Sequence, residues 1–149
     1  MSAKYINTLN DLIENSKDGE AGFKQCAEKA DSEALQRLFG ARAQECASAA
    51  AELQSIVASS GETPETSGTA SGALHRGWVS LKAALSRDDD LAMLEECERG
   101  EDHALARYRD ALKEELPADV RMVVQRQYEG AKRNHDQVRS LRDQARSHA

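Results

Sequence analysis

Two acidic residues, Glu98 and Glu101, stand where a predicted helix would place core side chains. Residues at alternating steps of three and four between positions 91 and 112 form one face of this helix. They are Leu91, Leu94, Glu98, Glu101, Leu105, Tyr108 and Leu112. A buried charge costs several kcal/mol unless another charge pairs with it or a metal ion binds it. The group that compensates these glutamates is therefore the best guide to function.

Counting residues along the predicted helices brings two more metal-ligand side chains, Glu20 and His135, to the level of these glutamates. Carboxylate oxygens and imidazole nitrogens together bind iron, manganese or zinc. One hypothesis is therefore a metal site formed by Glu20, Glu98, Glu101 and His135. Such a site would make the protein a metal-dependent oxidoreductase or a metal-storage protein.

The sequence lacks the full ligand set of a di-iron bundle, in which two helices each carry a Glu-x-x-His pair. Lys132 stands three residues before His135, and Ser48 stands three residues after Glu45. The metal hypothesis is thus limited to one ion.

Two nearby aspartates are not included among the candidate metal ligands because of their angular position on the helices. At 100° per residue, Asp18 points away from the apolar face of the first helix. Asp102 lies at the edge of the face that carries Glu98 and Glu101.

The alternative hypothesis needs no metal ion. Arg42 lies on the core face of the second helix at the same level, where its guanidinium can pair with a carboxylate. With Asn134 and His135 it would complete a buried polar network that sets the register of the helices. The sequence leaves both hypotheses open, so Glu98 and Glu101 are compensated either by Arg42 or by a metal ion.

Four long helices must position these side chains. The periodicity predicts helices over residues 4–30 and 33–56, a third from the acidic run at 88–90 to residue 112, and a fourth from Pro117 to Arg146. Ser32 is a suitable N-cap for the second helix, and Pro117 suits the first turn of the fourth. Each consecutive pair has a very short turn and is expected to form an antiparallel hairpin.

The connection between the two hairpins is long. The connection, residues 60–87, follows the end of the second helix. It consists of most of the loop-like stretch SSGETPETSGT (59–69) and a short amphipathic helix over residues 70–86. A connection of this length can cross the whole bundle. We therefore expect an all-α, ferritin-like four-helix bundle with up-down-down-up topology and a short fifth helix in the crossover, as one domain over residues 1–149.

Composition limits the function classes. The chain of 149 residues has 31% charged residues and a net charge of −6, which argues against nucleic-acid binding. It has no stretch of about 18 apolar residues that could span a membrane and no N-terminal signal pattern. The sequence contains no phosphate-binding loop and no nucleophile elbow, so we assign no catalytic or cofactor-binding residue. A non-catalytic protein is favoured, and an enzyme stays open as the alternative.

The three cysteines are widely spaced and lie within helical patterns. Their odd number and spacing argue against a disulfide framework and favour a reducing cytoplasm. Cys26 and Cys46 are expected to pack as small apolar residues, and Cys97 to flank the core face of its helix.

The chain resembles a bacterial family of ferritin-like four-helix bundles, the domain of unknown function 2383 group. The similar segments are LNDLIENSKDGEAGF (9–23), TASGALHRGWVSLK (69–82), ECERGED (96–102) and QYEGAKRNHDQVRSLRD (127–143). The resemblance implies a ferritin-like bundle in the bacterial cytoplasm and supplies no catalytic residues.

We therefore expect a cytoplasmic bundle protein that is structural or stress-associated, binds metal weakly at most, and forms a homo-oligomer of two or more chains. The alternative is the metal-dependent oxidoreductase or storage protein described above. A third hypothesis is a scaffold that docks partners through the crossover helix or the basic fourth helix.

Overall fold

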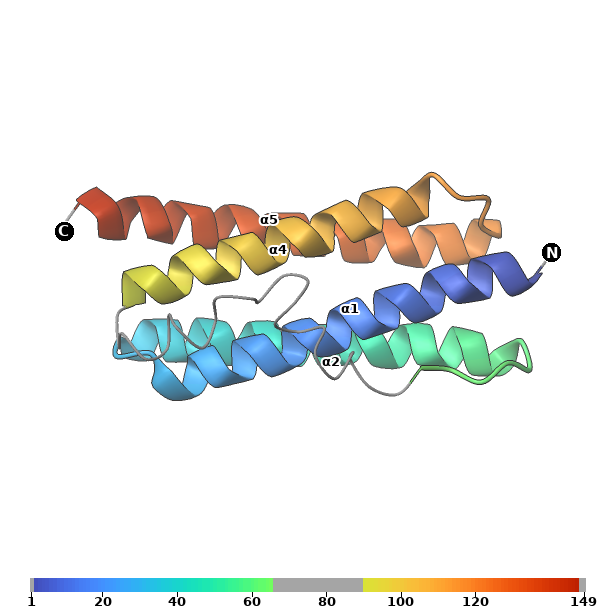
Figure 1. Cartoon of the computed structure of the whole chain (residues 1–149), viewed down its shortest axis with the longest axis horizontal. Helices are drawn as coiled ribbons and strands as arrows, with labels where there is room; N and C mark the ends of the chain where they lie inside the picture. Colours follow the sequence, from blue (N-terminus) through green and yellow to red (C-terminus); the bar gives the residue numbers. More distant parts are fainter. Residues whose placement is uncertain (1, 66–89, 148–149) are drawn as a thin grey trace.

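The computed structural model describes residues 2–65 and 90–147, and in these residues every regular element is an α-helix (Figure 1). The helices are α1 (Ser2–Lys29), α2 (Glu33–Ser59), α4 (Asp90–Leu112) and α5 (Ala118–Ser147). The predicted all-α class is therefore confirmed. The predicted short helix over residues 70–86 lies outside the described residues.

The helices form two antiparallel hairpins that lie side by side, α1 with α2 and α4 with α5 (Figure 1). The helices α1 and α5 run in one direction, and α2 and α4 run in the other. The carboxylate of Asp90, at the start of α4, accepts hydrogen bonds from the backbone N–H groups of Asp31 (2.9 Å) and Ser32 (3.1 Å). This residue therefore fixes the α1–α2 turn against the beginning of α4.

Local sequence explains where the hairpins turn. Ser32 caps α2 by accepting a hydrogen bond from the backbone N–H of Leu35 at 3.3 Å. Gly61, after the end of α2, has a φ of 87°, which glycine adopts without steric cost. Arg121 of α5 donates to the backbone oxygens of Leu112 (2.7 Å) and Glu114 (2.6 Å) and so satisfies carbonyls at the end of α4.

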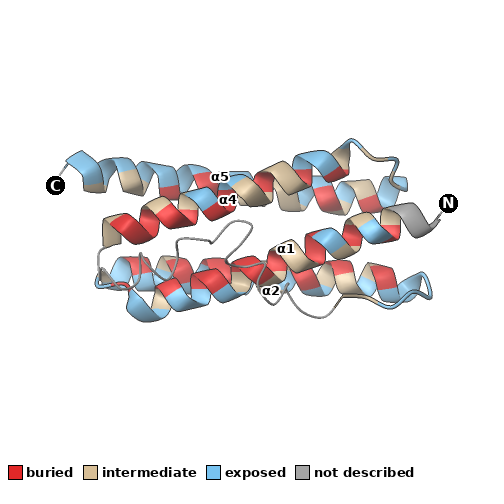
Figure 2. Ribbon diagram, in the orientation of Figure 1, coloured by how far each residue is buried: buried red, intermediate tan, exposed pale blue. Residues whose placement is uncertain are grey.

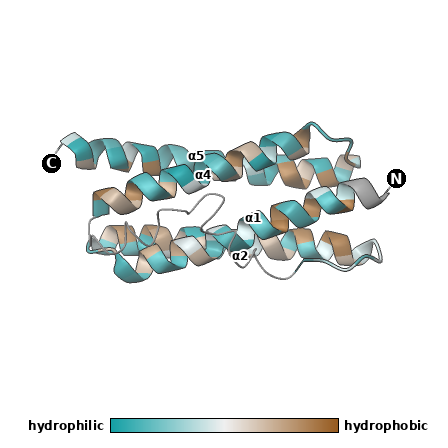
Figure 3. Ribbon diagram, viewed as in Figure 1, coloured by the Kyte–Doolittle hydropathy of each residue, from teal (hydrophilic) through white to brown (hydrophobic). Residues whose placement is uncertain are grey.

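The core consists of two apolar clusters with a polar layer between them (Figures 2 and 3). One cluster includes Phe23, Cys26, Phe39, Ala43, Met93, Leu94, Cys97 and Val138. The other includes Ile6, Leu9, Leu12, Ile13, Ala50, Leu53, Val57, Tyr108, Val120 and Val124. The buried polar residues include Ser16, Asp18, Arg42, Glu96, Glu101 and His135. None of the described helices has the length and apolar character that crossing a bilayer requires.

The buried face of α4 is wider than predicted and is rotated toward Cys97. Cys97 is completely buried, whereas Glu98 and Leu91 are only partly buried. The prediction that Cys97 flanks the core is therefore wrong. The physical reason is that α4 packs against both α1 and α5, so its covered surface extends beyond a single row of residues.

Replacing Asp90 with alanine tests the contact between the hairpins. We expect Asp90→Ala to lower the free energy of unfolding by about 1–2 kcal/mol, because two backbone donors lose a charged acceptor. Urea unfolding followed by circular dichroism measures the loss. The control is Asp110→Ala on the same helix, whose carboxylate is exposed and lies 3.9 Å from Lys113. Equal stability of the two variants would contradict this role of Asp90.

Candidate metal and polar-core site

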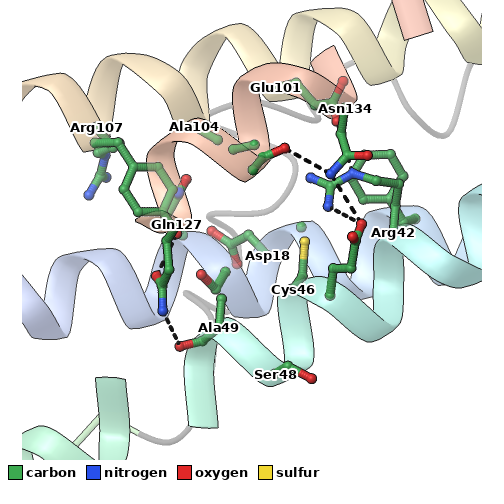
Figure 4. Close-up of a pocket in the computed structure, with 18 of the residues that line it drawn as sticks. Asp18, Arg42, Cys46, Ser48, Ala49, Glu101, Ala104, Arg107, Gln127 and Asn134 are labelled. Carbon is green, nitrogen blue, oxygen red and sulfur yellow. Dashed lines mark hydrogen bonds and ion pairs between the residues drawn. The ribbon is translucent and has the colours of Figure 1, made fainter. Parts of the chain in front are cut away.

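Arg42 lies in the polar layer, with its guanidinium directed toward Glu101 of α4 (Figure 4). Its side chain is 8% exposed, and its Nε donates to Glu101 Oε2 at 3.3 Å. Its Nη1 donates to Glu45 Oε1 at 2.8 Å, and its guanidinium carbon lies 5.1 Å from the centre of the Phe23 ring. The guanidinium is therefore held by two carboxylates and an aromatic face, contacts that favour its charged form.

Glu101 is the carboxylate that the sequence places in the core and that the structure buries, with 4% of the residue exposed. Burial raises the pKa of Glu101 to about 7, and the charge of Arg42 opposes this rise. Its Oε2 is bound by Arg42, while its Oε1 is buried without a hydrogen-bond partner. The compensation of this glutamate by Arg42 is the arrangement that the metal-free hypothesis requires.

All four helices contribute to a cavity of about 600 Å³ next to this ion pair. Figure 4 shows Asp18, Cys46, Glu101 and Gln127 around it. Tyr108 Oη donates to Gln127 Oε1 at 2.9 Å, and Gln127 Nε2 donates in turn to the backbone oxygen of Ala49 and to Glu52. Hydrogen bonds through Gln127 therefore join α4, α5 and α2 at one part of the cavity wall.

The predicted outward orientation of Asp18 is wrong. This residue is 7% exposed and lines the cavity. The physical reason is that α1 contacts both α2 and α4, so its covered face extends from Ser16 through Asp18 to Gly19.

A second group of polar residues lies between α4 and α5, where Glu98, Asp102 and His135 converge. His135 Nε2 lies 2.6 Å from Asp102 Oδ1 and 3.9 Å from Glu98 Oε2. One ligand atom from each residue lies within 4.8 Å of the others. Glu98 and Asp102 are four residues apart, so a single helical turn presents both carboxylates to His135.

The surroundings of His135 orient its ring. Asp136 Oδ1 lies 3.5 Å from His135 Nδ1. The opposite ring nitrogen, Nε2, is buried and makes no hydrogen bond, although it faces the two carboxylates of α4. A carboxylate beside one imidazole nitrogen and oxygen atoms beside the other is an arrangement typical of a metal-binding histidine.

Arg142 contributes a charge that sequence reasoning missed. Its side chain is only 15% exposed, and its Nη1 pairs with Glu98 Oε1. Its Nη2 donates to Asp143 Oδ1 at 2.8 Å. The spacing signal was present, because Arg142 lies seven residues after His135 and thus two helical turns along the same face of α5.

The four residues of the predicted metal site therefore have different surroundings. Glu98 and His135 lie together, with Asp102 as their neighbour. Glu101 is bound to Arg42. Glu20 lies 3.3 Å from Lys17 and 4.0 Å from Lys24 on its own helix, with 23% of its side chain exposed. Asp102 joins the cluster although it is an edge residue, because its carboxylate reaches His135 across the interface between α4 and α5.

A protein-family model matches most of the chain. Residues 4–114 match the family described as a domain of unknown function, DUF2383. This range contains three of the four segments on which the resemblance rested and does not include residues 127–143. No curated protein matches the chain.

Removing the central cation should destabilise the fold. We expect Arg42→Met to lower the free energy of unfolding at pH 8 by about 3–5 kcal/mol, because Glu101 is left as a buried charge without a partner. At pH 5 the loss should be smaller, since Glu101 can then take up a proton. Urea unfolding at the two pH values measures both effects. The control is Arg37→Met, whose exposed pair with Glu33 contributes little. A negligible loss in Arg42→Met at pH 8 would contradict the pairing.

Glu101 should also give the stability a measurable pH dependence. Its pKa in the folded protein is about 7, above its ordinary value of 4.5, so the folded state binds more protons between these limits. Its contribution is fully present below pH 4.5 and is lost as the pH rises through 7, by about 3 kcal/mol in total. We expect the free energy of unfolding, measured by urea unfolding between pH 4.5 and pH 8, to depend less on pH in the Glu101→Gln variant. The exposed control Glu33→Gln should keep the pH dependence of the unchanged protein. If the free energy of unfolding of Glu101→Gln depended on pH as it does in the unchanged protein, a group other than Glu101 would be responsible for the pH dependence.

Proposed function

The chain belongs to the DUF2383 family, and we propose that it is a non-catalytic, ferritin-like helical bundle that binds one divalent transition-metal ion weakly. The binding residues are Glu98, Asp102 and His135, and the ion is zinc, manganese or ferrous iron. The proposal keeps Glu98 and His135 from the site expected from the sequence and replaces Glu20 and Glu101 with Asp102.

The observation that carries the proposal is the position of His135 Nε2 opposite two carboxylates, without a hydrogen bond. Two carboxylates and one imidazole are three protein ligands, which leaves further coordination positions for water. Asp136, beside Nδ1, would hold the ring in the tautomer whose Nε2 carries the free electron pair. The side chain of Asp102 is 63% exposed, so an ion can reach the site from solvent.

Weak binding follows from the charges around the site. Arg142 is bound to one oxygen of Glu98, and its positive charge lies close to the position of the ion. The nearest carboxylate oxygen of Glu98 is 3.9 Å from Nε2, so that side chain must shift for both to reach a metal ion. Both effects lower the affinity.

The surroundings of the other acidic residues support a single ion and a non-catalytic role. A di-metal centre needs carboxylates from all four helices. Glu20 of α1 lies beside two lysines, and Glu45 of α2 is bound to Arg42 and Asn134. An enzyme or storage protein of the di-iron type therefore has less support than a single binding site.

The ferritin-like topology is part of the proposal, and the opposite directions of α1 and α2 and the parallel course of α2 and α4 support it (Figure 1). We also propose a bacterial cytoplasmic protein, which the three free cysteines support. A homo-oligomeric state and an association with stress complete the proposal.

Titration with Zn²⁺ in the presence of a fluorescent chelator tests the site. We expect one bound ion per chain, and at least about tenfold weaker binding in His135→Ala and in Asp102→Asn, because each variant removes a ligand. The controls are Glu20→Gln and Glu101→Gln, which should bind as the unchanged protein does. Circular dichroism verifies that each variant is folded.

Two results would contradict this assignment. One is undiminished binding in folded His135→Ala. The other is loss of binding in Glu20→Gln, which would restore the site first expected from the sequence.

A further inference from the structure

Two of the three cysteines have their sulfur atoms in contact. Cys26 of α1 and Cys97 of α4 lie with their Sγ atoms 3.6 Å apart, and both residues are completely buried. The two residues are 71 positions apart in the chain and belong to different hairpins. We propose that Cys26 and Cys97 are a disulfide-forming site, oxidised by a small peroxide, that joins the two hairpins covalently.

The geometry requires only a small movement. A disulfide bond is about 2.05 Å long, so the two sulfur atoms must approach each other by about 1.5 Å. Rotation of two short side chains and a slight approach of α1 and α4, which already pack together, supply this distance. Cys97 lies inside α4 and Cys26 in the last turn of α1, and the packing of the cluster that contains Phe23, Phe39 and Met93 limits other orientations of the two side chains.

The chemistry is balanced with one peroxide molecule. The peroxide oxidises one thiol to a sulfenic acid and leaves as water; the second thiol then attacks the sulfenic sulfur, and a second water leaves as the S–S bond forms. The two thiols thus supply the two electrons that break the O–O bond. Cys26 and Cys97 already lie side by side, so the second step needs no encounter between molecules.

Burial makes the first step slow. Both thiols are completely buried, so an oxidant in solution does not reach them directly. Oxidation therefore requires brief separation of the hairpins and favours a small, uncharged oxidant such as hydrogen peroxide. The pair stays reduced under ordinary conditions and is converted only under sustained oxidation.

Cys46 provides a matched control within the same chain. It packs against the edge of the Phe23 cluster and lines the cavity, where its Sγ lies so close to the backbone of Gly19 that a Cβ added there would be 3.0 Å away. Of the three cysteines, all within the described residues, only the other two have their sulfur atoms in contact. Peroxide should therefore leave Cys46 outside any intramolecular bond.

The experiment treats the folded full-length protein with hydrogen peroxide and then counts thiols under denaturing conditions. The number should fall from three to one, and the intact mass should fall by two hydrogen atoms. Trypsin should release residues 25–29 joined to residues 88–99. The Cys46→Ala variant should go from two thiols to none. Its thermal midpoint should rise by several degrees on oxidation and return with dithiothreitol, because the bond restricts the unfolded chain.

The proposal is overturned if Cys26 and Cys97 remain free thiols after prolonged peroxide treatment, if either carries a sulfinic acid instead, or if the bond joins Cys46. Peptide mapping distinguishes these results. The outcome is independent of the metal site. The cross-linked peptide can form in a protein that binds no Zn²⁺, and Zn²⁺ can bind to a protein in which no cross-linked peptide forms.

Discussion

The ion pair between Arg42 and Glu101 is the constraint around which the other features of this bundle are arranged. It places a fully charged guanidinium between two apolar clusters, where each partner alone would be costly. The guanidinium also rests on the ring of Phe23, whose other contacts belong to the Cys26–Cys97 end of the core. Arg42 of α2 thus helps to fix the position of α4 along the bundle axis relative to α1. In this position Cys97 lies beside Cys26.

The same register divides the acidic residues of α4 between two environments. Glu101 faces the interior, and Arg42 neutralises it. Glu98, three residues earlier, faces α5, where His135 and Arg142 meet it. Because Asp102 is one turn beyond Glu98, the outer face of α4 offers two carboxylates to one imidazole. The inner face therefore stabilises the bundle, and the outer face has the composition of a binding site.

The sequence predicted much of this arrangement. Hydrophobic periodicity placed the four helices, and the short turns predicted the two hairpins. Counting along those hairpins placed His135 level with Glu98, and Arg42 at the level of both glutamates. The angular positions assigned to Asp18 and Cys97 were wrong, since a single row of residues is a poor description of a helix that packs against two neighbours. The sequence could not distinguish Glu98 from Glu101, because both lie on one predicted face and only the side-chain contacts in the folded protein separate them.

The most direct test of the division between Glu98 and Glu101 is anomalous X-ray diffraction from crystals grown with Zn²⁺. We expect one zinc peak per chain, within coordination distance of His135 Nε2 and Asp102, with Arg42 still bound to Glu101. A zinc peak between Glu20 and Glu101, with Arg42 displaced into solvent, would contradict the assignment of Arg42 as the partner of the buried carboxylate.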